Sequence, residues 1–268
     1  MMKNLIIKLI KLFFNNKREK VKGINIGFIK SPKDKRDHSI LVSSIESDKD
    51  INLIRVNERS KFQGKLPFCY AFGIADWYEH EIKGLIDVSE MFISYKTREH
   101  YNSIGKSSLG FKDTIGETTG AVLRDVFKIL KKDEIITDER FHKYIINNFN
   151  LKPDNFASMY AHLLTDRVKE YWRVYTKDEI TECLSQGHRI VLGMRLDSAF
   201  IRGRKKVVDA INVADAKYGH CMSLYGQEGD YYLIKNWWSG YPTFLKIKKS
   251  VVLNSKILIE MWSGKILR

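Results

Sequence analysis

The sequence contains few prolines and cysteines and no long apolar run. Its 4 prolines and 17 glycines among 268 residues argue against a collagen-like or low-complexity chain, and 44% hydrophobic residues argue against disorder. The cysteines at positions 69, 183 and 221 form neither a C-x-x-C pair nor an even set, which argues against a disulfide framework or a cysteine-based zinc module. No segment approaches the roughly 20 apolar residues of a membrane-spanning helix. We therefore expect a globular protein from a reducing compartment.

Acidic residues are also in deficit. The 46 Lys and Arg residues against 32 Asp and Glu give a formal net charge of +14, typical of proteins attracted to nucleic acid, anionic membranes or acidic partners. Residues 1–36 alone hold 11 basic and 2 acidic side chains, so the rest of the chain is only mildly basic. We therefore do not expect nucleic acid as a partner; affinity that falls steeply with salt would indicate it. The basic cluster at 202–206 is expected to be a solvated loop, with a contact to nucleic acid or a cell-wall polymer as the alternative.

The first 26 residues form a basic amphipathic extension. Polar residues at positions 4, 8, 11 and 15 follow helical spacing, and most of the other positions between them are apolar. Such a helix over residues 1–20 lies on a membrane surface or docks on a partner or on its own domain, and the sequence leaves these alternatives open. The basic cluster that follows it, in place of a small-residue cleavage site, argues against a secretory signal, so we expect a cytoplasmic or virion-associated protein. Residues 1–60 are an inhibitory pro-segment, an anchor or neither.

The remaining chain, residues 27–268, is predicted to be one α+β domain. Helical signals dominate from about 60 to 166, and short β-branched or aromatic runs separated by turn residues dominate from about 168 to 268. Helices are expected over residues 71–83, 89–102, 118–130, 154–165 and 177–186, and strands over 171–175, 189–196, 219–225, 231–235, 243–248 and 256–262. Two lobes would therefore meet where a helix end faces strand residues.

Cys69 is the first candidate for chemistry. It follows a proline-containing loop and heads a helix, where backbone N–H groups and the helix dipole favour an anion and lower the pKa of a thiol. His220 lies in a predicted strand beside Gly219, and Asn236 ends the next strand. Adjacent strands of a hairpin bring the last two side chains within reach. The amide oxygen can then accept from one imidazole nitrogen and leave the other facing the thiol.

Around these residues the sequence resembles the papain-like cysteine peptidases, of the compact type found in bacteria and their viruses. In that family a Gln-Gly precedes the nucleophile, and Gln63-Gly64 stands six residues before Cys69. The Cys-Trp-Ala-Phe that opens the family's central helix matches residues 69–72, and its Lys-Asn-Ser-Trp-Gly motif matches residues 235–239. Weaker similarity covers residues 27–37 and 119–125, so the resemblance spans about 27–262.

The spacing of the candidate residues is also similar to that of the family. His220 and Asn236 follow Cys69 by 151 and 167 residues, against an expected separation of about 130–150. The first separation is close to that range and the second somewhat beyond it. Membership would imply a helical N-terminal lobe of about 60–166, an antiparallel β-barrel-like C-terminal lobe of about 168–268, and an active site in the cleft between them.

The resemblance further implies a thiol endopeptidase that acts on polypeptides through a thioester acyl-enzyme, without a cofactor or a metal ion. Cys69 would be the nucleophile, His220 the general acid/base and Asn236 the residue that orients the imidazole. Gln63 would be the side-chain half of an oxyanion hole, whose other donor is the backbone N–H of Cys69. A hole of this kind stabilises the charge that develops on the carbonyl oxygen during acyl transfer.

Two further residues are expected at the substrate. Gly120 would leave open backbone with which an extended substrate pairs, and Trp238 would cover the histidine and asparagine from water. Phe68 and Trp237 are bulkier than the family's residues at these positions and are expected to crowd the cleft. They motivate the alternative of a papain-like scaffold with little or no activity, acting as a structural or binding component, for instance in a viral particle. The cysteines at 183 and 221 are expected to be core residues.

Overall fold

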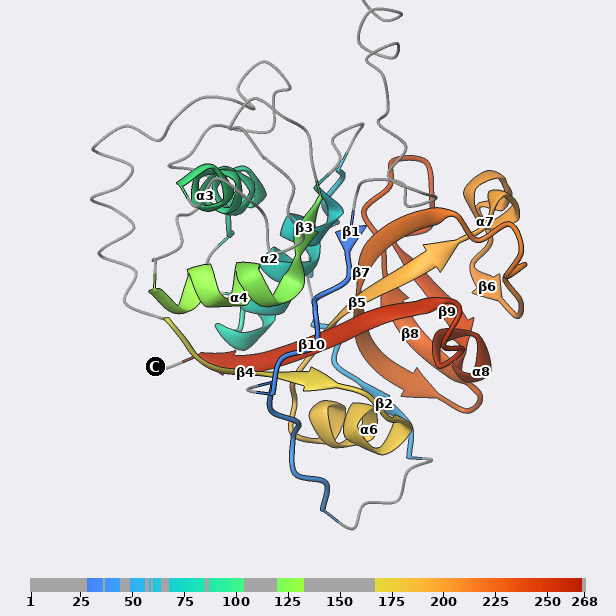
Figure 1. Ribbon diagram of the computed structural model, residues 1–268. Coiled ribbons are helices and arrows are strands. Elements are labelled where there is room, and N and C mark those ends of the chain that lie inside the picture. Colours follow the sequence, from blue (N-terminus) through green and yellow to red (C-terminus); the bar gives the residue numbers. More distant parts are fainter. Residues whose placement is uncertain are drawn as a thin grey trace, which may run out of the picture.

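The computed structural model places three helices on one side of a β-sheet. It describes residues 28–35, 37–43, 49–55, 58, 60–63, 68–84, 87–103, 120–132 and 167–266. The three helices are α2 (Cys69–Glu81), α3 (Glu90–Ser103) and α4 (Leu123–Lys132) (Figure 1). Of these, α2 packs on both α3 and strand β7 and so lies between α3 and the sheet, whereas α4 packs directly on β4. Within the described residues, no helix combines the length and apolarity needed to cross a bilayer.

The main sheet contains eight strands within the described part of the chain. In spatial order they are β4 (Val168–Val174), β10 (Leu258–Ile266), β5 (Ile190–Leu196), β7 (Tyr218–Glu228), β8 (Tyr231–Lys235), β9 (Phe244–Lys248) and β6 (Val207–Val208), and β2 (Ile51–Asn52) also pairs with β7. Neighbouring strands are antiparallel, apart from the parallel pair of β6 and β9. Among the described strands, β4 and β6 are the two edge strands of this order and do not pair with each other, so the sheet is open. A barrel-like closure of this lobe therefore stays a prediction.

Alternate residues of the central strands enter two different hydrophobic cores. Val191 and Cys221 belong to the core that contains α2, α3 and α4. Their chain neighbours Leu192 and Met222 belong to a second core, which contains α6 (Lys177–Ser185) and α8 (Lys249–Val252). Because successive side chains of a strand point to opposite faces, the position of a residue in β5 or β7 decides which core it reaches.

The α+β assignment is confirmed, and most expected elements lie within a few residues of their predicted bounds. The predicted helix over 71–83 is α2, that over 89–102 is α3, and that over 177–186 is α6. Helix α4 starts at Leu123 because Ala121 and Val122 form the short strand β3. The helix expected over 154–165 lies outside the described residues. The short elements α7 (Ser198–Gly203), α8 and β6 were not predicted from the sequence.

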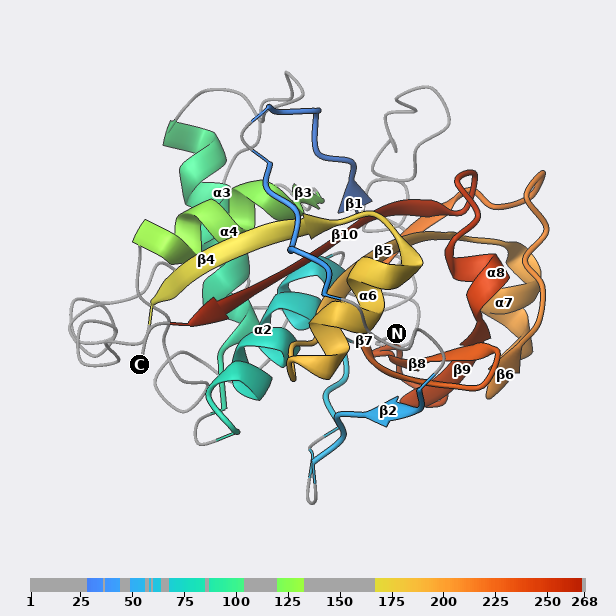
Figure 2. The same ribbon diagram turned by 90° about the horizontal axis from the view of Figure 1, so that it is seen from below.

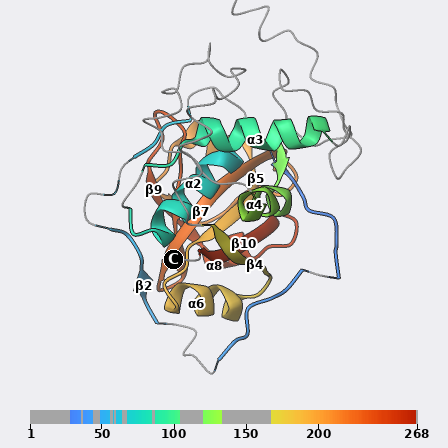
Figure 3. The same cartoon turned by 90° about the vertical axis from the view of Figure 1, so that its left-hand side faces the viewer.

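The segment before α2 passes around the domain. Its first strand, β1 (Phe28–Ile29), pairs in parallel with β3. The segment then runs over β4, where the carbonyl of His38 accepts the backbone N–H of Arg173, and on toward α6 (Figures 2 and 3). Ser43 donates its hydroxyl to Glu182 of α6 at 2.8 Å. The basic amphipathic extension expected over residues 1–26 lies outside the described residues, and the division of the chain into an extension and a domain stays a prediction.

Candidate active site

Cys69 is the first residue of α2, and backbone donors surround its sulfur. No side chain caps this end of the helix, so the first N–H groups of α2 are available to other acceptors. The backbone N–H groups of Cys221, Tyr70 and Cys69 itself hydrogen-bond the thiol sulfur. Backbone N–H groups that converge at a helix N-terminus form the kind of site that holds anions in many proteins.

Burial outweighs these donors. Cys69 is only 2% exposed, and the loss of hydration raises the pKa of its thiol to about 12, although the three N–H groups lower it. The N–H groups at the helix N-terminus lower this pKa as predicted, but burial has the larger effect, so the expectation of a thiol with a lowered pKa is wrong for the site as it stands here. The physical reason is that the hydration free energy that a thiolate loses on burial is larger than the stabilisation that three backbone N–H groups provide. At neutral pH the sulfur carries its proton.

The structure brings His220 and Asn236 together, as the predicted hairpin requires. Strands β7 and β8 meet at a turn that contains Gly229, with φ +50°, and Nε2 of His220 lies 2.9 Å from Oδ1 of Asn236. The same oxygen accepts the backbone N–H of Trp237 at 2.9 Å. Because a backbone N–H can only donate, the amide oxygen must face both groups, and Nε2 must carry a proton. Nδ1 is therefore the basic nitrogen of the neutral ring.

The imidazole of His220 is buried beneath an aromatic side chain. His220 is 1% exposed, and burial lowers its pKa to about 4, although the hydrogen bond to Asn236 raises it. The ring of Trp238 stacks on it, with 4.0 Å between the ring centroids and 27° between the planes. Trp238 thus lies against the residue that it was expected to cover. The imidazole is neutral over the whole physiological pH range.

Close packing of α2 on β7 brings Cys69 next to the strand that holds His220. Gly73 lies one helical turn beyond Cys69, and a Cβ at this position would lie 2.9 Å from Sγ of Cys221 and 3.1 Å from Cγ1 of Val191. Only glycine allows the helix to approach the strand this closely. The N–H of Cys221 can then reach the Cys69 sulfur. The thiol lies against the main chain of the residue that follows His220.

Trp237 connects three segments of the site. Its carbonyl accepts the backbone N–H of Gln63 at 2.8 Å, and its indole N–H donates to the carbonyl of Cys221 at 2.7 Å. Its ring packs on Phe72 of α2, with 6.1 Å between the centroids. Gln63 is itself buried, at 5% exposure. Phe68 also stacks on Phe72, so the two bulky residues expected to crowd the cleft are packed in the core instead. A buried tryptophan needs an acceptor for its indole N–H, and this requirement is the signal in the sequence that could have indicated the connecting role of Trp237.

Comparison with known proteins identifies the fold. No family model and no curated protein matches the sequence. Xylellain, a cysteine protease from Xylella fastidiosa, superposes with a TM-score of 0.77 at 19% identity, covering 94% of this chain and 99% of that chain. The cysteine protease and lectin-like domains of Cwp84 from Clostridium difficile give a TM-score of 0.65 at 12% identity, over 98% and 59% of the two chains. Digestive procathepsin L 3 of Tenebrio molitor larval midgut gives 0.58 at 12% identity, over 85% and 73%.

The chain has the papain-like fold. At these low identities the likeness establishes the fold alone, and it confirms at that level the resemblance drawn from the motifs around Cys69 and Asn236. In this papain-like chain Cys69 is the first residue of α2, and Asn236 directly follows β8. The hydrogen bond between Asn236 and His220 joins the end of β8 to β7.

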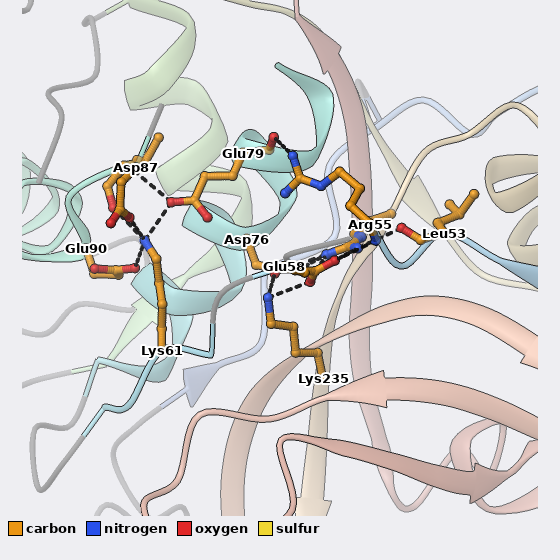
Figure 4. A network of polar contacts seen from close by, with 11 residues as sticks. Leu53, Arg55, Glu58, Lys61, Asp76, Glu79, Asp87, Glu90 and Lys235 are labelled. Atoms are coloured by element: carbon orange, nitrogen blue, oxygen red, sulfur yellow. Dashed lines mark hydrogen bonds and ion pairs between the residues drawn. The ribbon is translucent and has the colours of Figure 1, made fainter. Parts of the chain in front are cut away.

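A buried cluster of four charges connects α2 to the sheet (Figure 4). Arg189, which directly precedes β5, and Lys235 of β8 both pair with Asp76 of α2, at 3.0 and 2.6 Å, and both also pair with Glu58. Burial raises the pKa of Asp76, but the two cations outweigh it and hold that pKa well below its usual range. The cluster joins the helix that carries Cys69 to the residue that precedes the candidate asparagine.

A second buried cluster fixes the segment that leads to Gln63 (Figure 4). The ammonium group of Lys61 lies 2.6 Å from carboxylate oxygens of Glu79, Asp87 and Glu90. One cation cannot neutralise three carboxylates, and burial, together with the charge of Glu90, raises the pKa of Glu79 to about 7 although Lys61 lowers it. The cluster ties the segment before the candidate oxyanion residue to α2 and α3. These long-range partners were not found from the sequence.

The neighbourhood of Gly120 differs in part from the expectation. Gly120 is buried, and the two residues that follow it already pair in parallel with residues 28–29 of β1. Strand β1 also lies against β7. A substrate contact of Gly120 therefore stays a prediction, and no pattern in the sequence indicated that β1 pairs with the backbone beside it.

The remaining cysteines are core residues. Cys183 is fully buried and accepts the indole N–H of Trp172 at 3.2 Å, and Cys221 faces Gly73. Neither is part of a disulfide. Within the part of the chain that the structure describes, no three His, Cys, Asp or Glu side chains are grouped so that they could hold a metal ion.

Proposed function

We propose that the chain is a thiol peptidase that hydrolyses peptide bonds of a polypeptide, with Cys69 as nucleophile and His220 as general acid/base. The observation that carries the proposal is the position of the Cys69 sulfur against the N–H of Cys221, the residue beside His220. The hydrogen bond from His220 to Asn236 leaves Nδ1 as the basic atom of this imidazole. The papain-like fold, which the chain shares with several cysteine proteases, supports the same class of reaction.

The reaction starts from the neutral pair. Nδ1 of His220 accepts the thiol proton as the sulfur attacks the scissile carbonyl carbon. The resulting imidazolium gives that proton to the leaving amine, and the carbon–nitrogen bond breaks to leave a thioester on Cys69. A water molecule, deprotonated by Nδ1, then attacks the thioester. The carbon–sulfur bond breaks, the carboxylic acid leaves, and the imidazolium returns the proton to the sulfur of Cys69. Asn236 holds the ring in one tautomer and stabilises the imidazolium that forms in both steps.

Two donors stabilise the oxyanion in this proposal. They are the backbone N–H of Cys69 and the side-chain amide of Gln63, whose own backbone is fixed to Trp237. Removal of one such donor costs about 2.7–4 kcal/mol of transition-state stabilisation in known acyl-transfer sites. Burial alone keeps the thiol neutral, so opening of the site to water would let the three backbone N–H groups stabilise a thiolate.

Substrate contacts are proposed on either side of the pair. Trp238, which stacks on His220, would shield the imidazole and contact the substrate next to the scissile bond. Gly120 would offer its main chain to an extended polypeptide on the helical side. Both roles rest on the family resemblance and on the positions of these residues beside the site.

A second candidate function is a papain-like scaffold with little activity. It is favoured by the burial of both reacting groups, since Cys69 is 2% and His220 1% exposed. Such a protein would keep the fold and the hydrogen bond to Asn236 but would not turn over a peptide. A substrate that cannot reach the sulfur cannot form a thioester.

Turnover of a quenched fluorescent peptide pool by the purified chain tests the choice. We expect hydrolysis by the wild type, none by Cys69→Ala, and unchanged hydrolysis by Cys183→Ala, which removes an equally buried thiol from the other core. Circular dichroism verifies that both variants are folded. Activity that survives in Cys69→Ala would contradict the proposal, and a folded wild type without any turnover would favour the scaffold.

A further inference from the structure

We propose that the loop after α7 selects substrates with acidic side chains on the C-terminal side of the scissile bond. This inference rests on the proposed function and names the substrate class of that site. The basic loop is defined here as residues 202–206, and its four cations are Arg202, Arg204, Lys205 and Lys206, all exposed. It comprises the last two residues of α7 and the three that lead to β6, whose backbone pairs with β9.

The cations of the basic loop lack carboxylate partners. In the part of the chain that the structure describes, none of their side chains forms an ion pair or donates a hydrogen bond, in contrast to the paired cations Lys61, Arg189 and Lys235. Residues 198–208 include no acidic residue. The loop therefore presents uncompensated positive charge.

Nearby carboxylates are occupied by other groups. Asp197 caps α7 by accepting the backbone N–H of Phe200 at 2.7 Å. Asp215 accepts the backbone N–H of Ser198 at 2.9 Å. Arg202 forms no ion pair with Asp215 and interacts with its carboxylate only by longer-range electrostatic attraction. These bonds fix the N-terminal end of α7 and leave neither carboxylate paired with a cation of the basic loop.

Arg204 is held in a specific and strained position. Its backbone is left-handed, with φ 48° and ψ 36°, a conformation that non-glycine residues rarely adopt and keep where the surroundings impose it. Its guanidinium carbon lies 5.5 Å from the centroid of the Tyr241 ring. A Cβ on Gly240 would lie 3.4 Å from Nη1, so the turn that contains Gly240 packs directly against the guanidinium. This contact orders the side chain and leaves its N–H groups available to a ligand.

Aromatic contacts connect Arg204 to the candidate site. The ring of Tyr241 packs edge-on against Trp238, with 5.2 Å between the centroids, and Trp238 stacks on His220 at 4.0 Å. The hydroxyl of Tyr241 donates to the carbonyl of Ile201, which ties the turn after Trp238 to α7. The basic loop is thus two aromatic rings away from the imidazole.

The direction of the substrate follows from the chemistry. His220 must give its proton to the leaving amine, so the residues that follow the scissile bond lie on the side of the imidazole. That side continues across Trp238 and Tyr241 to Arg204. A planar guanidinium with available donors binds a carboxylate through two parallel hydrogen bonds, and the neighbouring lysines add attraction. An acidic polypeptide is favoured over nucleic acid because the unpaired cations form one short loop beside the site rather than a stripe along a face.

Two quenched peptides that differ only after the scissile bond test the proposal. They share the sequence before it and carry Glu-Glu or Gln-Gln at the second and third positions after it. We expect the wild type to cleave the Glu peptide with a kcat/KM about fivefold higher, a preference that shrinks at high salt. The variant Arg204→Gln/Lys205→Gln/Lys206→Gln should lose it. The control Lys131→Gln/Lys169→Gln/Lys256→Gln, which removes three exposed charges elsewhere, should keep it.

The outcomes separate this inference from the proposed function. Equal cleavage of both peptides by the wild type, or a preference that survives the loop substitutions, would overturn the acidic specificity while leaving the peptidase in place. If the wild type cleaves neither peptide although its Cys69 thiol is chemically intact, the proposed peptidase function is contradicted, and this inference is contradicted with it. Salt-dependent binding of a DNA or RNA oligonucleotide that needs the three loop cations, without discrimination between the peptides, would assign the loop to nucleic acid instead.

Discussion

The amide oxygen of Asn236 accepts two hydrogen bonds, from Nε2 of His220 and from the backbone N–H of Trp237, each at 2.9 Å. The second bond fixes which end of the amide faces the imidazole, and so it fixes the tautomer of the ring. A residue outside the proposed chemistry therefore determines which nitrogen can act as the base. This arrangement holds only while the main chain after β8 keeps its place.

Asn236→Ala should lower kcat at least about tenfold with little change in KM, because the imidazole loses the acceptor that fixes its tautomer and orientation. Steady-state kinetics with a fluorescent peptide measure both parameters. Asn254→Ala, a substitution after α8, serves as the control and should leave both unchanged. An unaltered kcat in Asn236→Ala would show that the hydrogen bond has no part in turnover.

Gly73→Ala should destabilise the protein by about 1–3 kcal/mol, because its methyl group would lie 2.9 Å from the Cys221 sulfur. Urea unfolding gives the free energy. The double variant Gly73→Ala/Cys221→Ala shortens the opposing side chain, so we expect it to recover part of the loss. Simple additivity of the two single changes would mean that the helix and the strand are not in contact here.

Asp76→Asn should cost about 3–5 kcal/mol of stability, since it removes a carboxylate from a buried pair of cations. Lys246→Gln breaks an exposed pair with Glu228 and should cost less than about 1 kcal/mol. Chemical denaturation compares the two variants. Equal losses would contradict the central role of the four-charge cluster in joining α2 to β5 and β8.

The pH dependence of kcat/KM should have its acidic limb near pH 4. Burial lowers the pKa of His220 from 6.5 to about 4, so Nδ1 remains able to accept a proton at any higher pH, and kcat/KM reports groups of the free enzyme. As pH falls, His220 is protonated in the unfolded chain before it is protonated in the folded protein. The neutral, buried imidazole therefore contributes to stability at neutral pH, and this contribution is lost as pH falls from about 6.5 to 4. A limb centred near 6.5 would mean that water reaches the ring.

Local sequence patterns predicted the parts of the site that are close in the chain. The turn at Gly229 places β7 beside β8, and this pairing brings His220 to Asn236. The start of α2 at Cys69 followed from the loop before it and the run of helix-forming residues after it. In these cases the residues that decide the geometry lie within a few positions of the site.

Features that depend on distant partners could not be predicted. Glu58 and Arg189 are separated by 131 residues, and nothing in either local sequence indicates the other. The protonation state of Cys69 reversed the expectation because the number of atoms that cover a sulfur is a property of the packed protein. Trp237 was interpreted by its size alone, whereas its function in the fold comes from the acceptor that its N–H finds on β7.

The central claim is that Cys69 is a reactive nucleophile, and covalent labelling tests it most directly. The folded protein would be treated with a peptidyl epoxide, digested, and analysed by mass spectrometry at each of its three cysteines. The account predicts one adduct, on Cys69, which forms faster than in the urea-unfolded chain and is absent from the thiols at 183 and 221. Labelling of Cys69 that is no faster in the folded than in the unfolded protein would contradict it.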